Sequence, residues 1–142
     1  MTTPDQPTPP DSSAPQHNAP QYGAPHYGSA PQPLNPSDER LWATLIHLSG
    51  IILGFIGPLI GFLVVGERGP FVRAHSATAL NFQISFAIYS IGIVFITFVT
   101  LGFGGLLVIP LVIGFYVFVI IAAVAANRGQ FYTYPLTITF VR

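Results

Sequence analysis

The stretch LWATLIHLSGIILGFIGPLIGFLVV occupies residues 41–65 and contains no charged side chain. As one helix it would measure ~37 Å, enough to cross a hydrocarbon core of ~30 Å with some tilt. Trp42 stands near its start, where aromatic side chains mark the membrane–water interface. Pro58 frees the carbonyl group of Gly54, so we expect a kink at Gly57-Pro58, or a re-entrant hairpin that would change the number of crossings.

Two further apolar stretches follow, at about residues 77–101 and 106–126. Gly66 to Pro70 forms a charged turn before the second stretch, and residues 102–105, with the sequence GFGG, form an uncharged turn after it. None of the three stretches carries the charged face that a helix of a soluble bundle needs. The sequence therefore predicts an all-α membrane protein, a three-helix transmembrane bundle.

The chain before this bundle has a different composition. Residues 1–36 are rich in Pro, Gln, Tyr and Gly and contain the near-repeat APQYG-APHYG at residues 19–28. Such a segment cannot bury a core, so we expect a disordered, low-complexity tail that serves as a spacer or as an interaction tail using Tyr22 and Tyr27. The transmembrane domain is expected at residues 37–142, with Asn35 capping its first helix and Pro36 at the first helical position.

Composition narrows the function. Charged residues make up 7% of the chain and the formal net charge is zero, whereas soluble domains carry about 25% charged residues. Five basic residues cannot neutralise a run of phosphates, so nucleic acid is not an expected partner. There is no Cys, and no Asp or Glu lies within a predicted span, so we expect no enzyme, no cofactor and no metal site.

Small residues recur along the first span. His47, Gly50, Gly54, Gly57 and Gly61 are spaced three or four apart and would share one helix face. Glycines at this spacing let helix backbones approach closely in lipid, which makes this a helix-packing face; a permeation groove lined by backbone is the alternative.

A polar stripe is expected on the second span. Thr78, Asn81, Ser85 and Gly92 fall on one side, with Tyr89 beside them. An amide in hydrocarbon requires partners, so Asn81 is expected to form an interhelical hydrogen bond, for instance to His47 or to a carbonyl near Pro58, or to contact a substrate or ion.

Three other polar side chains need an explanation. Gln83 points nearly opposite Asn81 and should meet another helix or another subunit. His47 and His75 are expected to be structural or interfacial, because a metal ion needs three or four ligands and no further His or carboxylate stands near them.

The last residues change period. Apolar and polar side chains alternate from Tyr132 to Val141, which is typical of an extended segment with one apolar face. We expect it to lie along the membrane interface with Phe131, Tyr132 and Tyr134 at headgroup level. A packed strand is the alternative.

Three short stretches resemble the Tic20-like bacterial family, also called DUF4870. They are PFVRAH at residues 70–75, ALNFQ at residues 79–83 and YTYPL at residues 132–136, and the first span with Gly57-Pro58 is similar as well. Members of that family are small multi-pass membrane proteins, mostly of unassigned function, named for their similarity to a chloroplast protein-import component. The resemblance implies a bacterial cell membrane location, and its motif positions fall on Arg73, His75, Asn81, Gln83, Tyr134 and Pro135.

With three spans, Arg68, Arg73, Arg128 and Arg142 would lie on one side of the membrane and Arg40 on the other. The positive-inside rule then predicts a cytoplasmic C-terminus. We expect a non-enzymatic accessory or scaffold subunit that is embedded in the lipid bilayer. It is expected to form homo-oligomers, or hetero-oligomers with other membrane proteins. The alternative is a small oligomeric channel or translocation component, with Asn81, Ser85 and His47 lining a hydrated path.

Overall fold

The computed structural model describes residues 31–142, and this part of the chain is helical, without a β-strand. Its elements are α1 (Pro36–Leu53), α2 (Ile56–Ile60), the π-helical turn η1 (Gly61–Val65), the 3-10 turn η2 (Gly66–Arg68), α3 (Pro70–Val99), the 3-10 turn η3 (Phe103–Leu107) and α4 (Val108–Asn127). The all-α class is confirmed for these residues. The predicted tail lies, up to residue 30, outside them.

Helix α1 begins as its sequence predicts and ends earlier than expected. The Asn35 side chain accepts a hydrogen bond from the backbone N–H of Asp38 at 2.9 Å, and Pro36 occupies the first turn. The helix stops at Gly54, which has a φ of +58°. Because glycine adopts this conformation at little cost, the chain reverses there and not at Gly57-Pro58.

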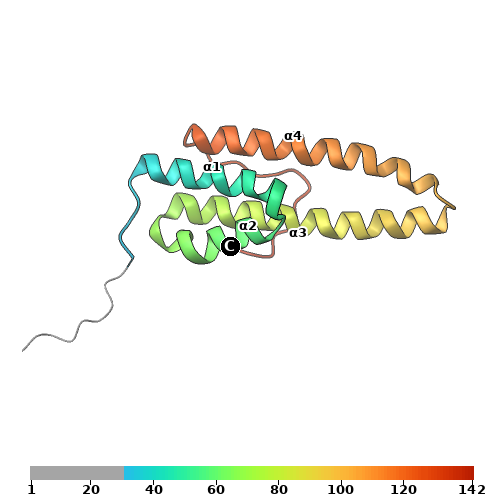
Figure 1. The fold of residues 1–142 in the computed structure, drawn as a ribbon, viewed down its shortest axis with the longest axis horizontal. Helices are drawn as coiled ribbons and strands as arrows, with labels where there is room; N and C mark the ends of the chain where they lie inside the picture. Colours follow the sequence, from blue (N-terminus) through green and yellow to red (C-terminus); the bar gives the residue numbers. More distant parts are fainter. Residues whose placement is uncertain (1–30) are drawn as a thin grey trace, which may run out of the picture.

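The residues after Gly54 return to the end of the molecule where α1 began (Figure 1). The backbone N–H of Leu34 donates to the carbonyl of Arg68 at 2.7 Å, and Nε of Arg68 donates to the carbonyl of Gln32 at 3.1 Å. Residues 34–68 thus form a closed helical hairpin. Residues 41–65 are not one continuous helix, because the Gly54 turn and the π-helical turn η1 redirect the chain.

Helices α3 and α4 form a second, longer hairpin that extends beyond the tip of α1 (Figure 1). By length and composition two helices are able to cross a membrane, at Pro70–Val99 and at Phe103–Asn127. The predicted span at residues 106–126 falls within the second helix, and the predicted span at residues 77–101 overlaps α3, which starts earlier, at Pro70, and ends two residues sooner, at Val99. Gly102, with a φ of +105°, makes the turn between them.

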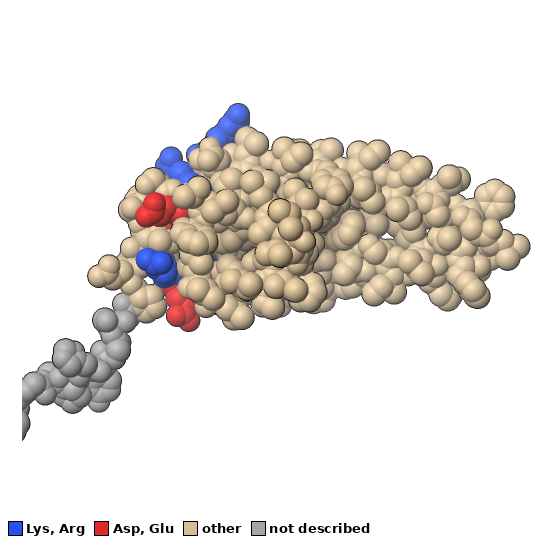
Figure 2. Space-filling view, viewed as in Figure 1, with Lys and Arg blue, Asp and Glu red and all other residues tan. Residues whose placement is uncertain are grey.

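Charged side chains gather at one end of the molecule (Figure 2). This charged end contains the first turn of α1 with Arg40, the η2 turn with Arg68, the first turn of α3 with Arg73, and Arg128 just after α4. A Cβ atom at Gly129 would lie 2.8 Å from Nε of Arg40. Arg40 therefore lies at the same end as Arg128, which differs from the expected placement on opposite sides; the reason is the reversal at Gly54.

Small side chains let α1 pack between the two long helices near the charged end. Helix α1 contacts both α3 and α4, and its Ala43 is fully buried together with Ala122 and Ala126 of α4. Close approach of this kind is how helices associate in lipid. The core therefore lies in the half of the molecule nearest the charged end, and the far halves of α3 and α4 have exposed apolar side chains such as Phe98 and Ile109.

The C-terminal segment, residues 130–142, is neither helix nor strand. It runs from the end of α4 along α3, turns at Pro135-Leu136 and comes back, with Leu136 at a φ of +58°. Figure 1 shows it as the coil that crosses the helices and ends near α2. The segment is not the packed strand that was the alternative expectation, because side chains of α3 hold it against a helix.

Candidate functional site

A cluster of buried polar side chains joins α1, α3 and the C-terminal segment. This polar layer consists of His47, His75, Asn81, Gln83, Ser85 and Tyr134, each between 1% and 7% exposed. At ~1.5 Å per residue, Asn81 and Ser85 lie ~16 and ~22 Å along α3 from Pro70, at a depth where water is scarce if α3 crosses a membrane. Polar groups at that depth must find partners within the protein.

Three rings of the polar layer form one hydrogen-bonded chain. Nε2 of His47 lies 2.8 Å from Nδ1 of His75, and the hydroxyl of Tyr134 lies 2.9 Å from Nδ1 of His47. A neutral imidazole has one donor and one acceptor nitrogen, so the donors must all run in the same direction along the chain. If the hydroxyl of Tyr134 donates to Nδ1 of His47, then Nε2 of His47 donates to Nδ1 of His75. The proton of the His75 ring then lies on Nε2.

That last nitrogen has no hydrogen-bond partner within residues 31–142. The backbone of Gln130 lies near the ring without completing a hydrogen bond to Nε2. The rings of Phe71 and Phe131 cover His75, with centroids at 4.4 and 5.8 Å. His75 is thus buried beneath aromatic side chains.

Asn81 clamps the end of the chain onto α3. Its Oδ1 accepts hydrogen bonds from the backbone N–H groups of Phe140 and Val141 at 2.9 and 2.8 Å, and its Nδ2 donates to the carbonyl of Val141 at 2.8 Å. The side-chain amide therefore provides the hydrogen-bond donor and acceptor that a neighbouring β-strand would offer to the extended backbone of residues 140 and 141. The partner of Asn81 is this segment, not His47 or a carbonyl near Pro58.

The next two turns of α3 continue this contact. Ser85 Oγ accepts from the N–H of Ile138 at 2.9 Å while donating to the carbonyl of Asn81, and the hydroxyl of Tyr89 donates to the carbonyl of Leu136. The predicted polar stripe thus holds a non-helical segment, which membrane proteins tolerate at depth only where the protein itself supplies the hydrogen bonds.

Gln83 leaves α3 in another direction and reaches α1. Its Nε2 donates to the carbonyl of Gly50 at 3.0 Å. A Cβ atom at Gly50 would overlap this amide, so glycine is required for the contact. The polar layer as a whole ties α1 and the C-terminal segment to α3.

A comparison with known protein families finds a match over most of the described residues. The family model of the magnetosome magnetite crystal formation protein family, MamF_MmsF, matches residues 38–141. The chain belongs to this family. The resemblance to the Tic20-like family, DUF4870, is therefore wrong: the short stretches that suggested it lie within the MamF_MmsF match. No curated protein and no solved structure matches the chain.

Membership of the MamF_MmsF family and the two apolar helices together make this a membrane-associated protein. Two of the residues singled out in the sequence, Arg73 and Pro135, lie outside the polar layer. The guanidinium of Arg73 lies over the ring of Phe62, 4.6 Å from its centroid, and Pro135 forms part of the turn in the C-terminal segment.

The four glycines of the expected packing face do not share one helix, because α1 ends at Leu53. Gly57 faces Ser49, and Gly61 faces Ile46 and Ser76, so these two bring the returning limb of the hairpin against α1 and α3. Gly54 has open space around it and makes the turn.

Sequence reasoning missed Glu39. Its Oε2 accepts hydrogen bonds from the backbone N–H groups of Phe71 and Val72 at 3.0 and 3.3 Å, and so caps the first turn of α3 from α1. An acidic residue in the first turn of α1 was visible in the sequence, but its partner lies thirty-two residues away, and no local pattern shows that contact.

Two tyrosines of the C-terminal segment are held in the protonated state. Burial, reinforced by the neighbouring Tyr132, raises the pKa of Tyr134 above its ordinary value of 10.0, and burial also raises the pKa of Tyr132. The hydroxyl of Tyr134 therefore stays available as a hydrogen-bond donor. Among residues 31–142, no group of three or more His, Cys, Asp or Glu side chains converges as metal ligands do.

Proposed function

We propose that this protein is a non-enzymatic scaffold subunit that crosses the bilayer twice, through α3 and α4, and associates with neighbouring membrane proteins. One observation carries the proposal: residues 34–68 and the C-terminal segment both fold back onto α3 through hydrogen bonds of the polar layer. The side chains of Gln83, Asn81 and Ser85 form hydrogen bonds with the protein's own backbone. These bonds hold the three parts of the chain rigidly together, as a scaffold requires.

The distribution of charge supports this topology. The hairpin of α1 returns to the charged end, so α1 enters and leaves at the same membrane surface. Arg40, Arg68, Arg73 and Arg128 then lie at one surface, which the positive-inside rule places in the cytoplasm of a bacterial cell. The residues that cross to the far side, from Thr100 to Leu107, carry no charge.

The face of α3 that carries Gly92 borders an open groove toward η3 and α4, and this groove offers a surface for association. At Gly92 a Cβ atom would meet nothing, and an open apolar groove of about 700 Å³ beside it is lined by residues that include Ile88, Ile96 and Leu107. Bare backbone at a glycine allows another helix to approach closely in lipid. The MamF_MmsF description names magnetite crystal formation in magnetosomes, and a supporting membrane subunit is the role for which this fold is suited in that setting.

The topology is tested by single cysteines, since the chain has none of its own. Ser37→Cys and Gln130→Cys should react with a membrane-impermeant maleimide from the same face of oriented vesicles. Phe103→Cys should react from the opposite face, and Leu53→Cys, at the hairpin tip, from neither. Labelling of positions 37 and 130 from opposite faces would mean an odd number of crossings and would contradict the proposal.

Association is tested by disulfide crosslinking in lipid. Gly92→Cys should form crosslinks to a second copy or to a co-purified membrane protein, whereas Ile91→Cys, its neighbour on a different face of α3, is the matched control and should form far fewer. A protein that stays monomeric and without partners in native membranes would contradict a scaffold role.

A further inference from the structure

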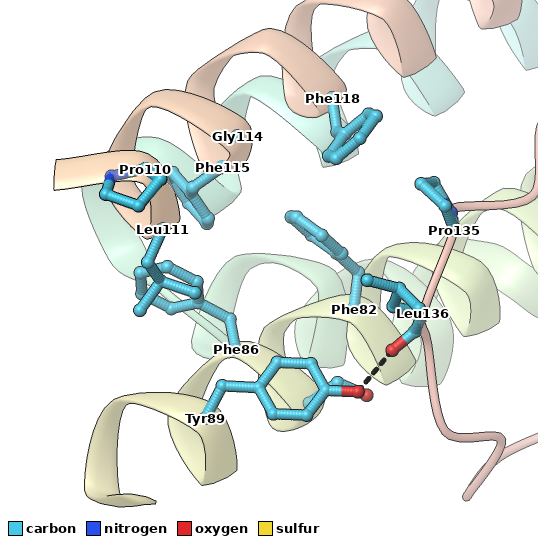
Figure 3. Close-up of a pocket in the computed structure, with 11 residues that line it drawn as sticks. Phe82, Phe86, Tyr89, Pro110, Leu111, Gly114, Phe115, Phe118, Pro135 and Leu136 are labelled. Atoms are coloured by element: carbon cyan, nitrogen blue, oxygen red, sulfur yellow. Dashed lines mark hydrogen bonds between the residues drawn. The ribbon is translucent and has the colours of Figure 1, made fainter. Parts of the chain in front are cut away.

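Helices α3 and α4 separate beyond the polar layer and leave an apolar slot between them. At its inner end is a cavity of about 250 Å³, whose lining includes Phe82, Phe86, Phe115 and Phe118 (Figure 3). A second cavity of about 360 Å³ continues toward the η3 end as far as Thr97. Phe86 and Leu111 line both cavities. The two cavities therefore adjoin and together form one slot.

The hydroxyl groups along the slot are already used. Ser90 and Thr97 donate to carbonyls of their own helix, at Phe86 and Ile93. The hydroxyl of Tyr89 points at the carbonyl of Leu136, as the dashed line in Figure 3 shows. The hydroxyl groups therefore have no free donor to offer a ligand, and the remaining walls are apolar, which favours an apolar occupant over water.

The inner end of the slot is too small for a turn of helix. One turn of a helix ~10 Å wide with a pitch of ~5.4 Å encloses ~420 Å³, more than the inner cavity provides. An empty slot is also unfavourable, because its walls would forgo dispersion contacts along their whole length. A thin, flexible, apolar chain is what remains.

The length of the slot fits a hydrocarbon chain of one leaflet. From Ser85 to Thr97 the helix rises ~18 Å, compared with ~15 Å for half of a ~30 Å hydrocarbon core. The slot also runs parallel to α3 and α4, the direction in which lipid tails lie. We infer that an acyl chain of a membrane phospholipid, from the leaflet at the η3 end, occupies the slot between α3 and α4 and completes the packing of these two helices.

Gly114 provides the variant that tests this inference. It lines the inner cavity on α4, and a Cβ atom there would meet only the Phe118 ring, at an ordinary contact distance of 3.8 Å. The side chain in Gly114→Leu therefore extends into the slot and takes the place of the lipid chain without displacing backbone. Gly92→Leu, which adds the same side chain outside the inner cavity, is the matched control.

The experiment is native mass spectrometry of the full-length protein after detergent extraction and washing. The wild type and G92L should retain a phospholipid adduct, and G114L should retain on the order of tenfold less, because the leucine fills the volume that the chain needs for its dispersion contacts. Equal phospholipid retention in wild type and G114L would overturn the inference.

A second measurement covers the case in which detergent replaces the lipid during extraction. Palmitoyl-oleoyl phosphatidylglycerol should raise the thermal unfolding temperature of washed wild-type protein, whereas glycerophosphoglycerol, its headgroup without chains, should not; G114L should gain less from the lipid than the wild type. An equal gain in both proteins would count against the slot. G92L, by contrast, should lose association while keeping its lipid, so failure of the scaffold proposal is distinguishable from failure of this one.

Discussion

The side-chain amide of Gln83, in the middle of α3, donates a hydrogen bond to the backbone carbonyl of Gly50, in the last turns of α1. This contact fixes the position of the hairpin of residues 34–68 along α3, because the carbonyl of residue 50 can be reached only where that residue has no side chain. The two residues act as a pair, and the pair can be tested.

We expect Gln83→Ala to destabilise the protein by ~1–2 kcal/mol, since one interhelical hydrogen bond and the packing of the side chain are lost. Gly50→Ala should cost a similar amount, because the added methyl group displaces the amide. In the double variant the effects should not add, since Gln83→Ala removes the atoms that the methyl group would meet. Thermal unfolding in lipid nanodiscs measures this, with exposed Gln130→Ala as the control. Full additivity would contradict the contact.

Glu39 should be important for the start of α3. Glu39→Ala leaves the N–H groups of Phe71 and Val72 without the carboxylate that accepts from them, and loss of a helix cap costs about 0.5–2 kcal/mol. Proteolysis near residues 66–70 should be faster in this variant than in Glu67→Ala, a matched change of an exposed carboxylate in the adjoining turn. Equal rates would show that the cap does not hold the turn.

Asn81→Leu should release the end of the chain while leaving the helices in place. The amide protons of Phe140 and Val141, which Asn81 accepts in the wild type, should exchange with solvent deuterium much faster, whereas amides of α4 should keep their protection. Ser85→Ala should have a smaller effect, centred on Ile138. Unchanged exchange at residues 140 and 141 would mean that something other than Asn81 holds the segment.

Tyr134 should make the protein sensitive to alkali. Its pKa is raised by burial, so its contribution to stability is complete below the ordinary tyrosine pKa of 10.0 and declines as the pH rises above that value. Tyr134→Phe should be less stable at neutral pH by ~1–3 kcal/mol, because Nδ1 of His47 loses its partner, and should lose less stability above pH ~10. Tyr132→Phe is the control. Parallel stability curves for wild type and Tyr134→Phe would refute this.

The sequence predicts the two long helices well, because their signal is local. The apolar runs of α3 and α4 and the turn at Gly102 can be read from neighbouring residues, as can the capping of α1 by Asn35. The reversal at Gly54 cannot, since a lone glycine is equally compatible with a helix in lipid, and the positive φ depends on the tertiary path. The kink was predicted at Gly57-Pro58 instead, but Pro58 lies within the short helix α2.

In the polar layer, too, the features that depend on neighbouring residues were predictable, and the contacts between residues far apart in the sequence were not. The stripe of Asn81 and Ser85 on α3 was predictable from helical spacing, and so was the need of Asn81 for a partner. The identity of the partner was not, because Val141 lies sixty residues away and its segment carries an alternating pattern that also fits an interfacial strand. The hydrogen-bonded chain of His47, His75 and Tyr134 joins three distant parts of the chain and has no local signal.

The reversal at Gly54 also bears on how such a protein enters a membrane. In the proposed topology, in which the first hairpin returns to its starting surface, a ribosome on that side would deliver only the loop between α3 and α4 through the hydrocarbon, and this loop, from Thr100 to Leu107, holds no ionisable side chain. Insertion of the paired helices then requires the transfer of no charge, so the largest electrostatic barrier to translocation is absent from the biogenesis of this chain.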